Sequence, residues 1–239
     1  MIRAPKTMLT CFLAVGLMAK VAVAQESPRD IKDEVEQSQK AAKVFHEIMS
    51  APDQAIPAAV LDDAICVAVF PEVIKAAFGV GGRGGRGVAS CRTAQGWSAP
   101  AYFGLGGGSV GWQIGVEVTD FVMLFMNDSG MNSLLSSKVT LGGDASIAAG
   151  PVGRQAGAET DGKLNAQILS YSRSKGLFAG VALKGTVIQT NDDDMRDAYG
   201  RAISAKEVLK DNKATAPAGA RAFPDMLAKH TTQKRTAQQ

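Results

Sequence analysis

The sequence predicts an α+β protein: an N-terminal amphipathic helix, then a curved, mostly antiparallel, glycine-rich β-sheet or barrel with short helices at its ends. The first observation is glycine placement, because residues 25–78 contain none whereas residues 79–200 contain 24 of the chain's 26. The second is a change of hydrophobic period near residue 65, from helical spacing to strand-like runs. Many strands with short connections and helices grouped at the ends favour this class.

The amphipathic helix is predicted for residues 28–50. Ser27 is a typical capping residue and Pro28 a typical first helical residue, and an acid follows three residues after the cap. Apolar side chains then recur at helical spacing, and Pro52 ends the pattern. A second, short helix is expected at residues 57–63.

The glycine-rich region predicts a series of strands. They are expected at residues 65–70, 87–92, 101–103, 112–118, 121–126, 139–141, 145–149, 166–171 and 177–189. Further helices are expected at residues 71–77, 130–137, 193–199 and 204–211. Glycines inside strands usually mark bulges, bends or close approach of two backbones, as a strongly curved sheet requires. The tail beyond Asn212 is expected to be mobile, apart from a short contact at 223–227.

Residues 1–24 are predicted to be a secretory signal peptide that is cleaved before Gln25. A basic start precedes the mostly apolar residues 8–19, and residues 22–24 read Ala-Val-Ala, the small-x-small pattern of a cleavage site. The expected location is therefore outside the cytoplasm, in the periplasm. The chain then divides into a signal peptide, a helical segment, a β-rich core and a C-terminal helix with a mobile tail, at residues 1–24, 25–64, 65–203 and 204–239.

Two alternatives stay open for this first segment. An uncleaved anchor needs about 20 apolar residues, and Lys20 limits the apolar run to about twelve. The other alternative is lipid modification at Cys11, although the two residues before it, Leu9 and Thr10, match a lipid-modification site poorly. Without Arg3, Lys6 and Lys20, the 26 basic residues become 23, equal to the 23 acidic ones. Binding to nucleic acid then loses its basic footprint, and we expect none.

Two cysteines remain after the signal peptide, Cys66 and Cys91, each in an apolar, strand-like run. In an oxidising compartment such a pair favours a disulfide. Two buried free thiols are the alternative, and only the distance between the two residues can decide.

The sequence indicates no catalytic, metal or cofactor site, so we expect a protein that is not an enzyme. The segment GVGGRGGRG at residues 79–87 precedes a strand, whereas a nucleotide loop precedes a helix. His46 and His230 are too few for a triad or a metal centre. Residues 192–194 read Asp-Asp-Asp but lack the other ligands of a calcium loop, so helix capping is favoured. A hydrolase with a concealed site is the weaker alternative.

Two basic stretches without acids, residues 73–92 and 162–191, are the remaining candidates for a site. If strand pairing brings them together, their side chains can grip a phosphate, with glycine-loop N–H groups as further donors. Ordinary solvated charge at strand ends is the alternative. The predicted headgroup-binding residues are Lys75, Arg83, Arg86, Arg173 and Lys175.

Three long motifs identify a resemblance to a known family. They are GWSAPAYFGLGGGSVGWQIGVEVTDFVMLFMN (96–127), LGGDASIAAGPVGR (141–154) and YSRSKGLFAGVALKG (171–185). In this order they resemble the SYLF domain, also called the Ysc84 actin-binding domain or DUF500, over roughly residues 40–203. The expected export and the paired cysteines are similar to the bacterial, secreted branch of that family.

The resemblance implies lipid binding without catalysis, since eukaryotic relatives bind phosphoinositides and some bind actin. We therefore expect binding of an anionic, phosphoinositide-like phospholipid at the cell envelope. The alternative is a structural component of the envelope that binds a protein. Residues 28–50 hold four bases against five acids, unlike the basic helix of eukaryotic relatives, so this helix is expected to pack on the sheet. Actin is not expected as a partner of an exported protein.

Overall fold

The computed structural model describes residues 31–51, 55–153, 166–174 and 176–231, without the side chains of 78–80 and 109–114. The predicted signal peptide, the helix start at 27–30 and the predicted ligand Lys175 therefore lie outside the described residues. None of the described helices is both long and apolar enough to span a bilayer.

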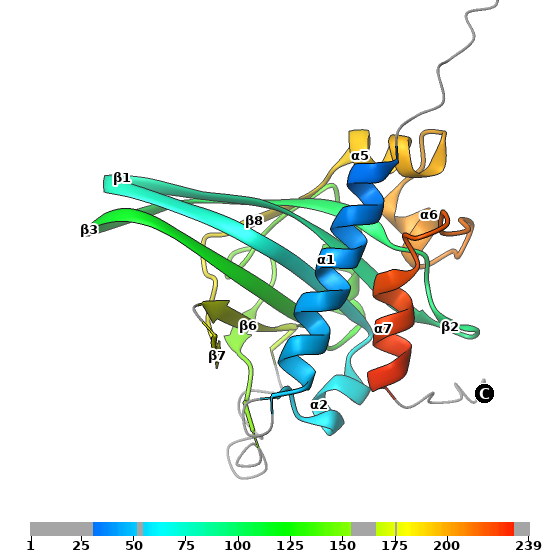
Figure 1. The fold of residues 1–239 in the computed structure, drawn as a ribbon, viewed down its shortest axis with the longest axis horizontal. Coiled ribbons are helices and arrows are strands. Elements are labelled where there is room, and N and C mark those ends of the chain that lie inside the picture. The colour runs from blue at the N-terminus through cyan, green and yellow to red at the C-terminus, as the bar shows by residue number, and fades with distance from the viewer. Residues whose placement is uncertain (1–30, 52–54, 154–165, 175, 232–239) are drawn as a thin grey trace, which may run out of the picture.

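The predicted α+β class is confirmed. The described residues form six helices and an eight-stranded sheet that curls into a half-barrel (Figure 1). All strand pairs are antiparallel except β5 with β6. The strands are β1 (Cys66–Thr93), β2 (Gly96–Trp97), β3 (Ala101–Phe125), β4 (Lys138–Thr140), β5 (Ile147–Ala149), β6 (Ile168–Ser174), β7 (Leu177–Gly180) and β8 (Val187–Thr190).

Two long strands, β1 and β3, form a continuous antiparallel ribbon where the sequence predicted several shorter strands. Their pairing runs from Cys66 opposite Phe125 to Ala89 opposite Ala101. β6 continues the sheet beside one end of β3, and β8 beside the other end. The labels of β1 and β3 in Figure 1 lie where the ribbon extends beyond the helices.

The helix predicted for residues 71–77 is wrong, because this segment continues β1 as a strand. The register with β3 shifts between Phe70 and Val73, so Pro71 lies at a bulge. A bulge is one of the few places in a sheet that tolerates proline, which has no N–H to donate. Glu72 there has a φ of 52°, and its N–H donates to Asp120 Oδ1 at 2.8 Å. The side chain of Asp120 thus replaces a ladder hydrogen bond.

The glycines of residues 79–87 have a structural role, as predicted from their number in strands. The second part of β1 lies against the first, and a Cβ built on Gly87 would be 2.3 Å from the Phe70 ring and 2.6 Å from the Val69 carbonyl oxygen. A Cβ on Gly85 would be 2.7 Å from the side chain of Val73. Only glycine allows backbones to approach this closely.

Two helices cover the ribbon. α1 (Lys32–Met49) buries one apolar face on the sheet, and α7 (Ala222–His230) packs beside it (Figure 1). The rings of Phe45 and Phe223 meet edge to face at 6.4 Å. The C-terminal contact predicted at residues 223–227 is therefore a longer, packed helix.

The remaining helices are short and lie near the ends of strands. They are α2 (Ala58–Asp63), α3 (Asp128–Leu135), α5 (Asp192–Tyr199) and α6 (Ala205–Leu209). The side chain of Asn191 accepts a hydrogen bond from the backbone N–H of Asp194 and caps α5. The capping residue of α5 is thus Asn191, and the three consecutive aspartates form the first turn that follows it. Ser204 and Glu207 form a reciprocal capping box on α6.

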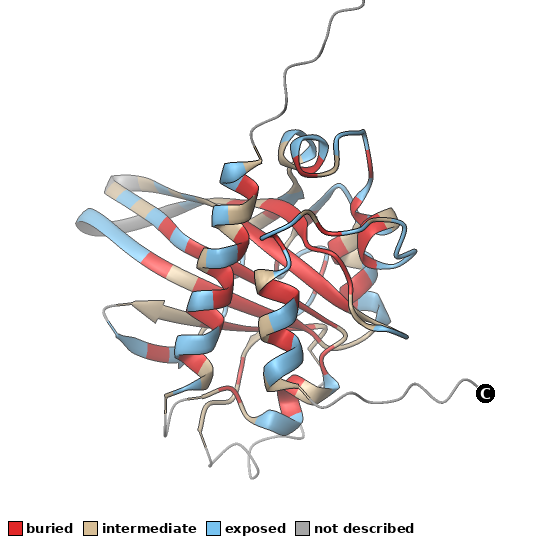
Figure 2. Cartoon of the chain, turned by 45° about the vertical axis from the view of Figure 1, so that its right-hand side comes forward, coloured by how far each residue is buried: buried red, intermediate tan, exposed pale blue. Residues whose placement is uncertain are grey.

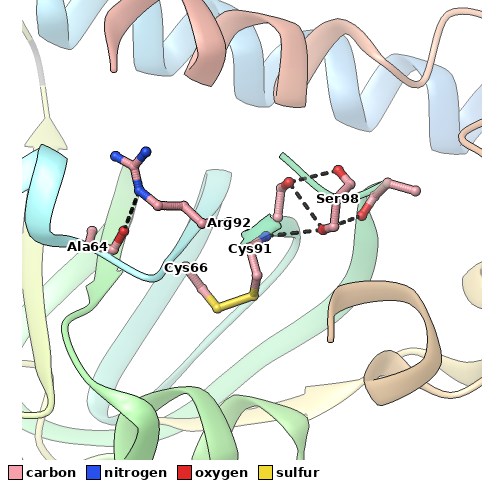
Figure 3. Close-up of a disulfide and its surroundings, with 7 residues drawn as sticks. Ala64, Cys66, Cys91, Arg92 and Ser98 are labelled. Atoms are coloured by element: carbon pink, nitrogen blue, oxygen red, sulfur yellow. Dashed lines mark hydrogen bonds between the residues drawn. A yellow bond between two sulfur atoms is a disulfide. The ribbon is translucent and has the colours of Figure 1, made fainter. Parts of the chain in front are cut away.

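Cys66 and Cys91 are joined by a disulfide in the structure, with Cα atoms 4.0 Å apart and both residues fully buried (Figure 3). The bond connects the first residue of β1 to its last part, beside the hydrogen bond from the backbone N–H of Cys91 to Ser98 Oγ. It therefore joins the two ends of the folded-back strand within the buried core. Its presence in the purified protein stays a prediction.

Candidate functional site

A groove of about 480 Å³ lies between α1 and the sheet and is the candidate binding site. Its walls combine charged and apolar side chains from α1, β1, β3 and β6. The charged residues are Lys40, Lys43, Glu47, Glu72, Asp120 and Arg173. The apolar ones include Val44, Pro71 and Val118. We call this set the α1 groove; its volume is in the range of small-ligand sites.

Arg173 is the predicted headgroup residue that lines this groove. Strand pairing places it opposite Asp120, and its Nε and Nη2 donate to Asp120 Oδ2 at 2.9 and 2.7 Å. Its Nη1 donates to Glu47 on α1. Burial opposes the charge of Arg173, but its hydrogen bonds to Glu47 and Asp120 outweigh burial and raise its pKa. Arg173, which belongs to β6, is thus fully charged and links α1 to β3 through its two carboxylate partners.

The two lysines of the α1 groove differ in their partners. Lys40 Nζ lies 3.0 Å from Glu36 and 3.0 Å from Glu72, and hydrogen bonds to these carboxylates raise its pKa. Lys43 is exposed and has no ion pair with any described residue. A ligand anion can therefore approach Lys43 without displacing a carboxylate.

The groove is balanced in charge, with three cations and three carboxylates on its walls. Among these carboxylates, Asp120 is 13 % exposed and Glu47 is 39 % exposed. Glu47 is therefore the partner of Arg173 that water and an incoming anion reach more easily. The sequence prediction of an acid-free basic site missed these carboxylates, because they come from α1 and from other strands.

Arg86 lies in a second cluster, near the start of α1. Its Nη2 is 2.8 Å from Asp194 and 3.6 Å from Glu34, whose side chain is 4 % exposed. Burial raises the pKa of Glu34 and that of Asp194, against the opposing effect of the Arg86 charge. One Glu34 oxygen has no hydrogen-bond partner among the described residues. This arrangement is typical of a structural ion-pair cluster.

The structure does not bring Arg86 and Arg173 together. Their partners on α1, Glu34 and Glu47, are thirteen residues apart, which is about 20 Å along a helix. The two basic stretches therefore meet α1 at opposite ends. Only Arg173 of the two lies in the α1 groove.

Lys75 and Arg83 are half-buried on β1 and do not line the α1 groove. Lys75 pairs with Glu117, and Arg83 pairs with Gly107, in the register of β1 with β3. The Nε of Arg83 is buried without a hydrogen-bond partner in the described part of the chain. The role of these two residues in headgroup binding stays a prediction.

The sequence reasoning missed Lys40 and Lys43, because it counted charge over the whole helix. Their spacing was the available signal: Lys43 and Val44 lie three and four residues after Lys40, and Glu47 lies four and three residues after them, so all four share one side of α1. Counting charges separately for each face of α1 would have distinguished this side from the more acidic rest of the helix.

An apolar surface continues from the groove. The described residues expose four large hydrophobic side chains: Ile74 (53 %), Val116 (74 %), Val118 (52 %) and Leu177 (71 %). Ile74 pairs with Val118, and their alternating positions place them and Val116 on one face of the ribbon. Leu177 pairs with Ser174, which hydrogen-bonds Glu117 at 3.2 Å. We call Ile74, Val116 and Val118 the ribbon patch; Val118 also lines the groove, and Leu177 lies on the opposite face with Ser174 and Glu117.

The two histidines, distant in sequence, meet where α1 and α7 pack. His46 Nδ1 and His230 Nε2 are 3.3 Å apart, and burial followed by the charge of His46 lowers the pKa of His230. Within the described residues, no group of three or more His, Cys, Asp or Glu is arranged to hold a metal ion. The pair is explained by helix packing.

Comparison with known proteins identifies a family that this chain matches. Residues 106–230 match the family described as "Ysc84: Las17-binding protein actin regulator". The chain is 36% identical over 186 residues to SH3 domain-containing YSC84-like protein 1 of Homo sapiens, covering 76% of this chain and 54% of the relative. It is 36% identical over 198 residues to Protein YSC84 of Saccharomyces cerevisiae, covering 80% and 42%.

The chain spans about half the length of these curated relatives, which come from a mammal and a yeast. The resemblance to a bacterial, secreted branch therefore stays a prediction. The expectation that actin is not a partner finds no support in these comparisons, because the matching family is described as an actin regulator.

Proposed function

Because the chain belongs to the Ysc84 (SYLF) family, we propose that it binds anionic, phosphoinositide-like phospholipid at its α1 groove, without catalysing a reaction. The observation that carries the proposal is the position of the groove. Cationic side chains on its wall adjoin the exposed ribbon patch through Val118. A phospholipid has the same arrangement, with a charged headgroup joined to apolar chains.

The charges of the groove suggest how a headgroup phosphate binds. Lys43 offers an ammonium group that forms no ion pair with the described residues, and Arg173 offers a guanidinium group whose Glu47 partner is partly exposed. A phosphate that approaches Lys43 can replace Glu47 on Arg173, while the more buried Asp120 keeps the guanidinium in place. Binding therefore replaces the Arg173–Glu47 ion pair with an Arg173–phosphate pair. Because one pair is lost for each pair formed, each headgroup adds little to the affinity.

This exchange predicts opposite effects for two substitutions in the groove. Lys43→Glu removes the free cation and should weaken binding about tenfold, whereas Glu47→Gln frees Arg173 and should strengthen it about threefold. The measurement is flotation with vesicles that contain an anionic phospholipid, at low salt, with vesicles of neutral phospholipid as the control. Unchanged binding of both variants, or weaker binding of Glu47→Gln, would contradict the proposal.

A second candidate function is binding to a protein partner, such as actin or an envelope component. The family description as an actin regulator favours it, and the ribbon patch is a suitable apolar contact. Sedimentation with filamentous actin is the direct test. If the protein pellets with actin and does not float with vesicles, this second candidate replaces the first.

We further propose export with removal of residues 1–24, since the Cys66–Cys91 disulfide suits an oxidising compartment. The intact mass of protein from the cell envelope should correspond to a chain that starts at Gln25. A mass that includes residues 1–24 would contradict cleavage and favour the anchored alternative.

A further inference from the structure

The ribbon of β1 and β3 has a part that none of the described helices covers (Figure 1). It lies where the ribbon folds back on itself, midway along the paired strands. We call its residues 74–77 of β1 and 115–118 of β3 the free end of the ribbon. All eight are exposed or half-buried, whereas Phe70 and Val122 in the same strands are fully buried. Figure 2 shows the exposed colour on the strands that extend past α1. The free end therefore offers side chains that the fold itself does not use.

The exposed side chains of the free end are apolar on one face only. Ile74, Val116 and Val118 point to one side because strand residues alternate, and Glu117 points to the other. Leu177 pairs with Ser174, which hydrogen-bonds Glu117, so Leu177 belongs to that other face. Three of the four large hydrophobic side chains that the described chain exposes thus share one face of the free end. Such a concentration marks an interaction surface.

We infer that the free end of the ribbon enters the interfacial layer of a phospholipid bilayer, with the ribbon patch facing the acyl chains and the α1 groove at the level of the headgroups. This inference rests on the proposed function and adds how the protein meets the membrane. Val118 belongs to both surfaces, so one orientation serves the patch and the groove together.

The geometry favours a bilayer over a second copy of this chain. A stable protein interface uses about 20–30 residues on each side, whereas the ribbon patch has three large apolar side chains. A bilayer needs no shape complementarity and accepts a narrow, projecting element. The main-chain groups between β1 and β3 are already paired, so these side chains enter the layer without breaking the ribbon's hydrogen bonds.

The charge balance of the groove has a consequence for salt dependence. Arg173 and Lys40 are held by carboxylates, so Lys43, which has no ion pair within the described residues, is the groove cation that dominates long-range attraction to an anionic surface. Apolar contact is insensitive to screening. Binding should therefore fall by less than about threefold between about 50 and about 300 mM sodium chloride.

The test compares two variants in a Trp97→Phe background, which leaves Trp112 in β3 as the only tryptophan. The patch variant carries Val116→Ser and Val118→Ser. Its matched control is Glu117→Gln, in the same strand but on the opposite face. Binding is measured by flotation with vesicles of phosphatidylcholine and an anionic phospholipid. Quenching of Trp112 by brominated acyl chains reports insertion, and thermal melts confirm that each variant is folded.

The background protein and the control should bind within about twofold of each other and show quenching. The patch variant should bind at least about tenfold more weakly, with quenching lost. If the background protein floats and the patch variant floats equally well, the inference is overturned and the proposed function stands. If the background protein does not float at all, both fall. A dimer in sedimentation velocity that the patch variant loses would assign the surface to a second copy.

Discussion

The two parts of the β1–β3 ribbon have similar strand sequences but different surroundings. Near the disulfide, the ribbon lies under α1 and α7 and its side chains are fully buried on both faces. Beyond the bulge at Pro71 the same two strands stay paired with a shifted register, and at the free end they expose Ile74, Val116 and Val118. The difference is helix coverage, since hydrogen bonding between the strands is common to both parts.

This comparison separates what holds the fold from what is available for binding. The covered part holds the disulfide, the close contacts of Gly85 and Gly87, and the buried charges, whereas a Cβ on Gly81 would meet Ala76 and Ala77 of the free end. The free end contributes little to the core, so its apolar side chains can be altered at small cost to stability. We therefore expect substitutions in the covered part to change the stability of the protein, and substitutions of the apolar side chains at the free end to leave it nearly unchanged.

The largest expected effect is loss of the disulfide. The Cys66→Ala, Cys91→Ala double variant should lose about 3 kcal/mol of unfolding free energy, because the bond closes a loop across 25 residues. Urea unfolding measures this loss, and peptide mapping after alkylation measures the bond itself. The matched comparison is Val116→Ser with Val118→Ser at the free end, which should cost less than about 0.5 kcal/mol. Alkylated Cys66 and Cys91 in the native protein would contradict the disulfide.

A somewhat smaller effect is expected at Gly87. In Gly87→Ala the new methyl group would meet Phe70 and the Val69 carbonyl oxygen, and overpacking should cost about 2 kcal/mol. Gly84→Ala is the control, because the nearest atom to its Cβ, the Leu105 carbonyl oxygen, is 3.9 Å away. The readout is the urea midpoint of each variant. Equal midpoints would show that the two halves of β1 are not closely packed.

The smallest effect is a pH dependence that belongs to the covered part. Burial and the nearby carboxylates Asp194 and Asp197 raise the pKa of Glu34, and Arg86 opposes them. The native state therefore binds this proton more readily than the unfolded state. Glu34 should thus destabilise the fold progressively as pH rises from about 4 through its raised pKa.

Glu34→Gln removes this titration. Its unfolding free energy relative to wild type should increase by about 1 kcal/mol from pH 4 to pH 7. The comparison with wild type at each pH cancels the opposite contribution of His230, whose lowered pKa destabilises the fold as pH falls. Parallel pH profiles for the two proteins would mean that Glu34 is not buried among these charges.

Parts of the fold were accessible to sequence analysis because local patterns dictate them. The period of apolar residues located α1, and Asn191 and Ser204 marked the starts of α5 and α6. The joining of several predicted strands into β1 and β3 was not accessible. Pro71 reads as a helix start in isolation, and only its pairing with β3 makes it a bulge.

The candidate site was predictable only in part. Arg173 was selected because no acid is near it in the sequence, yet Asp120 and Glu47 lie against it in space. Those contacts cross 53 and 126 residues of sequence separation. A count of charges along the chain has no information about such pairs, so it overestimated the positive charge of the site.

The sequence by itself determined the class of the fold, the amphipathic face of α1, and the need for glycine in residues 79–87. These properties depend on neighbours within a few residues, where spacing and side-chain size are sufficient. Tertiary structure alone decided that Arg86 and Arg173 lie at opposite ends of α1, that carboxylates neutralise both, and that the described helices leave residues 74–77 and 115–118 uncovered. Charge pairing and burial are set by distances between segments far apart in the chain, and those distances exist only after the sheet has curled and the helices have packed on it.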